Sequence, residues 1–161
     1  MSAGRLAQPE MLEPGDEVRT TASVEYVVPR PRGNWWATSP DLGSQYKTTP
    51  RYRSNAVTAE TVVPFKDKNF VTGRYEWSQR DELFADNPSL VHQLAVQTGS
   101  RFFNVAYTIG YTRDFGRFHD VETGLGANVS LYGIPAAIKT YYGDHPAGFN
   151  VYLRIRLKEN R

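Results

Sequence analysis

Acidic and arginine side chains recur at every second position in several segments of this 161-residue chain. Side chains two residues apart in an extended strand point to the same side of the sheet. Acids and arginines that share one face can pair with one another, line a polar passage and set its selectivity, or simply face water. The residues expected to form this polar face are Glu25, Glu60, Arg74, Glu76, Glu122, Arg154 and Arg156, together with Glu17, Arg19 and Arg80.

Metal chemistry has little support in the sequence. The chain has no cysteine, which excludes disulfides, thiolate zinc sites and cysteine catalysis. His92 and His145 fall in two long connections expected on the same side of the fold, with Asp144 beside His145, and are weak candidates for a metal site. No histidine lies two or four residues from another, so the simpler interpretation is isolated surface histidines and no metal.

Catalytic signatures are also missing from the sequence. It contains no Gly-x-Ser-x-Gly, no glycine-rich phosphate loop after a strand and no His-Glu-x-x-His. Asp81 and Glu82 are adjacent, but neighbouring residues of a strand point to opposite faces, which prevents them from acting as an acid–base pair. The net charge of +2 disfavours a nucleic-acid partner. We therefore expect no enzyme, no cofactor and no nucleic-acid binding.

Period-two alternation is the main structural signal. Aromatic residues make up 13% of the chain, and 13 glycines and 10 prolines supply turns, so the composition favours an all-β fold. Residues 1–16 show no alternation and are expected to form an irregular N-terminal segment, with the strands in 17–158 and a tail at 159–161. The segments expected as strands are 17–28, 34–39, 55–65, 70–82, 102–115, 121–132 and 149–158.

The lengths of the strands and connections favour a membrane barrel. Most segments reach about ten residues, whereas globular strands average about 5–6 and tilted membrane-spanning strands need about 9–11. Short and long connections alternate, which is typical of outer-membrane barrels. For residues 87–97 the sequence allows two alternatives: a short helix that starts at Asn87–Pro88, or an extension of the next strand. The short connections are 29–33, 66–69 and 116–120, and the long ones are 39–54, 83–101 and 133–148.

The expected fold class is an antiparallel, up-and-down (meander) β-barrel of about seven to eight long strands, either closed or a segment of a larger barrel. Closed bacterial barrels nearly always have an even number of strands, so seven strands indicate part of a larger barrel. Residues 1–13 lack the apolar core of a secretory signal. Either the protein is cytosolic or the start of the natural chain is missing, as the larger barrel would require.

Six stretches of strand and turn sequence also carry a resemblance. They are EPGDEVRTTASVEY, GNWWATS, YEWSQRDELF, IGYTRDFG, VETGLGANVSLYGIP and YYGDHPAGFNVYLRIRL. Together they resemble the C-terminal half of a family of uncharacterised Gram-negative outer-membrane β-barrel proteins, over about residues 13–157. The resemblance implies a larger barrel whose earlier strands precede Met1, and it brings no binding residues with it.

Two positions depart from the family pattern. SPDLGSQYK stands where the family continues an aromatic, glycine-containing strand, so the second strand is expected to be cut short. The last strand ends at Leu157 and is followed by Lys158-Glu159-Asn160-Arg161, not by the terminal aromatic residue that the assembly machinery reads. This ending argues against efficient membrane assembly of this chain.

The function expected from these observations is an outer-membrane β-barrel, structural or porin-like, with a charge-balanced polar lumen. Its partners would be membrane lipid and small polar solutes, and its location the outer membrane of a Gram-negative bacterium. The alternative is a soluble lipocalin-like β-barrel that carries a small apolar ligand, and a further one is an adhesion or metal-capture protein acting through its long loops. Sidedness distinguishes the first two, because a carrier needs its apolar face inside.

Overall fold

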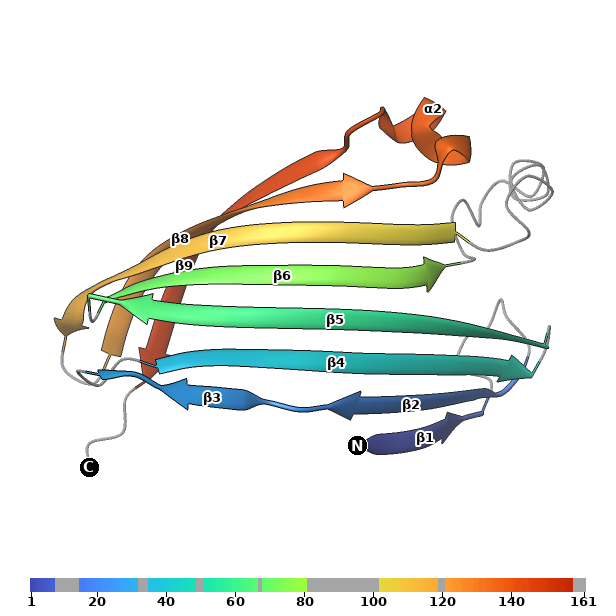
Figure 1. Ribbon diagram of the computed structural model, residues 1–161, viewed down its shortest axis with the longest axis horizontal. Helices are drawn as coiled ribbons and strands as arrows, with labels where there is room; N and C mark the ends of the chain where they lie inside the picture. The colour runs from blue at the N-terminus through green and yellow to red at the C-terminus, as the bar shows by residue number, and fades with distance from the viewer. Residues whose placement is uncertain are drawn as a thin grey trace.

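The chain folds into one antiparallel β-sheet, which confirms the all-β meander expected from the alternation. The fold is known from a computed structural model that describes residues 1–7, 15–31, 35–48, 51–66, 68–80, 102–118 and 121–157 (Figure 1). The strands of these residues are β1 (Ser2–Leu6), β2 (Glu17–Ser23), β3 (Tyr26–Pro29), β4 (Trp35–Thr48), β5 (Arg51–Phe65), β6 (Asn69–Arg80), β7 (Phe102–Phe118), β8 (Val121–Gly133) and β9 (Ala147–Leu157).

The sheet has the order β1-β2-β4-β5-β6-β7-β8-β9, and β3 continues the line of β2 along β4. Eight strands therefore lie side by side within the described residues. Each pairs antiparallel with its neighbour, so the edge strands β1 and β9 run in opposite directions. In Figure 1, β8 and β9 curl behind the rest of the sheet. β1 and β9 are not paired with each other in this sheet, which is open between them.

The second strand is much longer than expected, and the predicted long connection 39–54 is wrong. β4 runs on through SPDLGSQYK to Thr48, and only residues 49–50 separate it from β5. Backbone pairing on both sides, with β2 and with β5, overrides the weak strand propensity of this segment. The strict alternation of short and long connections therefore fails at this point.

The N-terminal segment is not wholly irregular, and it adds a strand to the seven segments that the alternation predicts. Ser2–Leu6 form β1, which pairs with β2. The Ser2 and Thr21 hydroxyls lie 2.7 Å apart, and Arg5 forms an ion pair with Asp16, so side chains as well as backbone hold β1 in place. The argument for a larger barrel from an odd strand number loses its basis.

Strands β6 and β8 both end at the same end of the sheet, on the right in Figure 1. Residues 81–101 join β6 to β7, and residues 134–146 join β8 to β9. The second connection contains η2 (Ala136–Ile138) and α2 (Lys139–Tyr142). The predicted alternatives for 87–97, and the candidate His92, lie outside the described residues. No helix in the described part of the chain is long and apolar enough to cross a membrane.

Candidate functional site

The polar face of the sheet is its buried face. In β7 and β8, Ala106, Thr112, Asp114 and Ser130 are each less than 9% exposed. The residues that alternate with them point the other way and are open, with Ile109 65% exposed. We call the polar side the inner face and the apolar side the outer face. This sheet therefore buries polar groups and exposes apolar ones.

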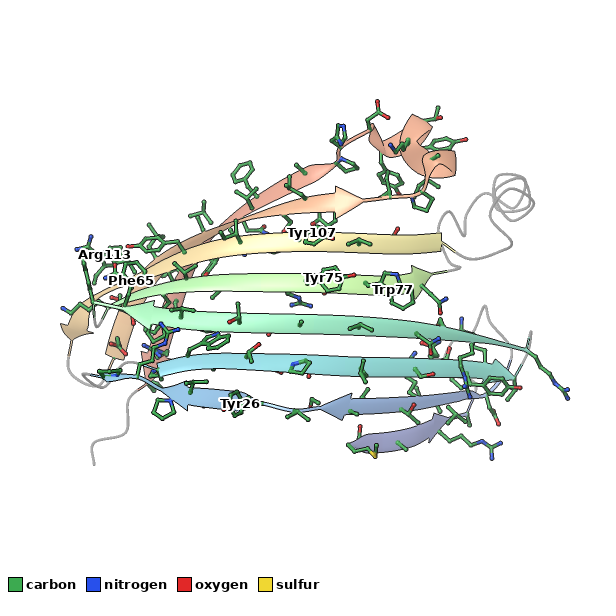
Figure 2. All side chains as sticks on the ribbon, in the orientation of Figure 1. Tyr26, Phe65, Tyr75, Trp77, Tyr107 and Arg113 are labelled. Carbon is green, nitrogen blue, oxygen red and sulfur yellow. The ribbon has the colours of Figure 1, made fainter. Side chains whose placement is uncertain are left out.

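β9 shows the same alternation over its central part. Phe149, Val151, Leu153 and Ile155 are each more than 60% exposed on the outer face. Their neighbours Tyr152 and Arg154 are half-buried on the inner face. The outer faces of β5 to β7 add aromatic residues, which Figure 2 labels. Tyr75 and Tyr107 pair there with their ring centroids 5.3 Å apart.

One charge cluster of the inner face is centred on Asp114, which is 3% exposed. Arg154 donates to one oxygen of the Asp114 carboxylate, and Arg156 donates to the other at 2.9 Å. Arg156 also donates to Glu122 at 2.8 Å. The four side chains form two acid–arginine pairs and carry no net charge. They tie three strands together, β7, β8 and β9.

Local backbone features allow these side chains to meet. Register places Asp114 opposite Gly124, and Gly124 opposite Arg154, so the arginine reaches the acid across a residue without a side chain. A Cβ on Gly124 would lie 2.9 Å from the carbonyl oxygen of Arg113 and would also collide with the Asp114 carboxylate. The bulge in β7 begins directly after Asp114. Arg154 also stacks on Phe70 on the inner face, 4.5 Å from the ring centroid.

A second cluster contains three of the predicted residues. Arg74 of β6 lies 3.0 Å from Glu60 of β5 and also pairs with Glu76 of its own strand. Register places Glu60 directly opposite Arg74. All three side chains are between one third and one half exposed, so each pair contributes little stability. Among the described side chains of this cluster, two carboxylates share one guanidinium, so these three groups together carry one negative charge.

A third cluster lies on β2 and β4. Glu17 and Lys47 are directly opposite and both nearly buried, with 3.7 Å between Nζ and Oε1. Gln45 donates to Glu17 at 2.9 Å, and Arg19 approaches the same carboxylate at 2.7 Å. This arrangement satisfies a carboxylate that would otherwise be costly to bury.

The structure thus brings together eight of the ten predicted polar-face residues, in three clusters, and the side chain of a ninth, Arg80, lies outside what the structure describes. Glu25 is the exception, because it lies exposed between β2 and β3. Asp114 and Lys47 were not among the predicted site residues. Asp114 has the same parity as the polar residues of β7, which was a usable signal, whereas Lys47 fell in the expected loop.

The weak metal candidate His145 lies exposed beyond α2, on the chain segment leading to β9. Among the residues that the structure describes, no three His, Asp or Glu side chains are close enough to hold a metal ion.

Neutral hydrogen bonds fill the inner face between the clusters. The Tyr152 and Thr112 hydroxyls are 2.6 Å apart, and those of Thr108 and Ser130 are 2.7 Å apart. The Tyr152 ring lies over Gly126, where an added Cβ would come within 2.6 Å of the ring carbon Cε2. The glycine is therefore required for the ring to lie flat against β8.

Gly126→Ala should lower the free energy of unfolding by about 1–3 kcal/mol, because the methyl group overpacks the site beneath Tyr152. Chemical denaturation of the refolded protein measures this. Removing the ring in Gly126→Ala/Tyr152→Ala should abolish the cost of the added methyl, relative to Tyr152→Ala alone. Gly116→Ala is the matched control, since nothing lies within 4 Å of its added Cβ. Equal effects at the two glycines would contradict this account.

Comparison of the chain with protein-family models, with curated proteins and with solved structures gives no significant match.

Proposed function

We propose that this chain is a membrane-embedded β-barrel protein of the outer-membrane type, with lipid against its outer face and a charge-balanced polar interior. The observation that carries the proposal is the inverted sidedness of the sheet. Asp114 is 3% exposed on the inner face, whereas the outer-face residue Leu153 is 63% exposed. A soluble sheet has the opposite arrangement, because burial of apolar surface drives folding in water.

The extent of the outer face supports contact with lipid. Soluble monomers rarely expose a contiguous apolar patch larger than a few hundred Å². Here three adjacent strands, β7 to β9, expose large apolar side chains along their lengths. The members that are more than one third exposed are Tyr107, Ile109, Tyr111, Phe115, Leu125, Val129, Leu131, Phe149, Val151, Leu153, Ile155 and Leu157.

Strand length also supports the proposal. β4 to β9 contain 11 to 17 residues each, and a tilted strand crosses the hydrocarbon core with about 9–11. Open sheet edges are not tolerated in lipid. In the membrane, the opposed edges β1 and β9 must therefore be paired, either with each other or with strands of another chain.

The contacts favour a structural role for the polar interior. The Asp114 cluster joins β7, β8 and β9, and Arg74 joins β5 and β6, so the charges hold neighbouring strands together. Acids and arginines alternate over this face, so a polar passage along it would show little preference for anions or cations. The resemblance to Gram-negative outer-membrane barrels points to the same location.

A soluble carrier of a small apolar ligand fits this geometry less well. Such a barrel needs apolar side chains around its interior, but here they lie mainly on the outer face. The carrier would purify without detergent and remain monomeric.

Refolding with and without detergent tests the proposal. We expect a compact species only in detergent or lipid, and we expect its mobility on a gel to change when the sample is heated, because closed membrane barrels resist unfolding by the gel detergent. A soluble, monomeric β-protein in plain buffer would contradict the membrane assignment and favour the carrier.

A further inference from the structure

A cavity lies between the inner face and the connection that joins β8 to β9. The side chain of Ile138, at the end of η2, is 1% exposed and is among the most deeply buried side chains described. Beneath the connection is a space of about 500 Å³. Pockets that bind small molecules typically measure about 300–1,000 Å³. Its apolar lining includes Ala56, Ala106, Ile134, Ile138, Tyr142 and Pro146.

Two hydrogen-bond acceptors, on Asn104 and Glu76, are among the polar groups that line this cavity. Asn104 lines it, and the side-chain oxygen of Asn104 is buried without a hydrogen-bond partner among the described residues. Glu76 contributes a carboxylate, and Thr58 and Ser78 contribute hydroxyls. An unsatisfied buried acceptor is costly, so a ligand that donates a hydrogen bond to Asn104 would remove that cost.

The charge of the Arg74 cluster, which adjoins the cavity through Glu76, favours a positively charged donor. Within the part of the chain that the structure describes, Glu60 and Glu76 share the guanidinium of Arg74, so this cluster carries one excess negative charge. By contrast, the Asp114 cluster pairs two acids with two arginines and is balanced. The cavity therefore adjoins the cluster in which one described cation faces two described acids.

We propose that this cavity binds a small organic cation: an ammonium group carried on an apolar or aromatic body. The ammonium would donate to Glu76 and to the free oxygen of Asn104, and the body would lie under Ile138 and Tyr142. This assignment depends on the cavity and its charge, not on the membrane location. A failure of this binding site would therefore not count against the proposed function, and a failure of the proposed function would not count against the site.

Equilibrium dialysis of the folded full chain against tryptamine tests the site, with protein-free medium as the blank. Tryptamine carries an ammonium on an indole, and indole-3-propionate is an anion of similar size. We expect saturable binding of tryptamine and none of indole-3-propionate. Glu76→Gln should weaken tryptamine binding at least about tenfold, because a hydrogen bond to a charged partner is lost. Ala56→Phe should abolish binding by filling the cavity from β5.

Asp144→Asn is the matched control, because it removes one acid from the same connection at an exposed position that does not line the cavity. It should leave tryptamine binding unchanged. The site would be refuted if tryptamine failed to saturate, if the anion bound equally well, or if both acid variants weakened binding alike. The comparison of the two ligands uses the unmodified chain, so the test does not depend on whether a variant folds.

Discussion

Replacing Val151 by arginine should lower the free energy of unfolding in a bilayer by about 2–4 kcal/mol, which is the cost of an arginine facing lipid near the membrane midplane. Val151 lies near the middle of β9 and is 63% exposed on the outer face. In water, an exposed valine of this kind would tolerate arginine to within about 0.5 kcal/mol. Denaturant titration of the protein folded into lipid vesicles measures the difference.

The adjacent residue provides the control. Asn150 lies on the inner face of the same strand and is exposed. Its side chain donates a hydrogen bond to the neutral amide of Asn128. Asn150→Arg should change the free energy of unfolding by less than about 1 kcal/mol. Two substitutions of the same chemistry, one residue apart, thus report on the two faces. Equal costs at both positions would contradict the lipid-facing assignment of the outer face.

Replacing Asp114 by alanine should cost about 3 kcal/mol or more, because removing one partner of a buried ion pair leaves the remaining charge uncompensated. The carboxylate is 3% exposed and accepts from both Arg154 and Arg156. In this variant, Arg156 still forms its ion pair with Glu122 and is nearly half exposed. Most of the lost free energy of unfolding therefore comes from leaving Arg154 without Asp114. Equilibrium unfolding of the refolded protein gives the value.

Asp144→Ala is the matched control for this prediction. Asp144 is 78% exposed and lies 3.8 Å from Lys139, so its loss should cost no more than about 1 kcal/mol. A second comparison removes Asp114 together with Arg154, in Asp114→Ala/Arg154→Leu, so that Arg156 and Glu122 stay paired. This double variant should be more stable than Asp114→Ala alone. A cost below about 1 kcal/mol for Asp114→Ala would show that the cluster does not stabilise the sheet.

Within an uninterrupted strand, the sequence was sufficient to predict which residues share a face. Alternation has a period of two, and a residue's side follows from its position alone once a strand is recognised. Glu60, Arg74 and Glu76 were therefore predicted on one face, and the structure places them in one cluster. The contacts between strands were not predictable, because they depend on register. Arg154 meets Asp114 only because both are in register with Gly124.

The errors have specific physical causes. The segment from Ser39 to Thr48 contains Pro40 and Gly43, which indicate a loop, but pairing with strands on both sides keeps it extended. Proline has no N–H to donate to the sheet. Strands β2 and β3 pair one after the other with β4, and the break between them lies next to Pro40. Val24, which lies in this break, donates its backbone N–H to the Pro40 carbonyl oxygen. Glu25 follows at this interruption, so an alternating pattern did not place it on the inner face.

Site-directed spin labelling along β9 tests the lipid-facing outer face most directly. The chain has no cysteine, so each introduced cysteine from 147 to 157 carries the only label. In lipid vesicles, the account predicts that collision with dissolved oxygen alternates with a period of two and is highest at Phe149→Cys, Val151→Cys, Leu153→Cys and Ile155→Cys. The even-numbered positions should show low oxygen collision. Labels at the odd positions that collide mainly with a water-soluble nickel chelate, or a profile without alternation, would contradict the account.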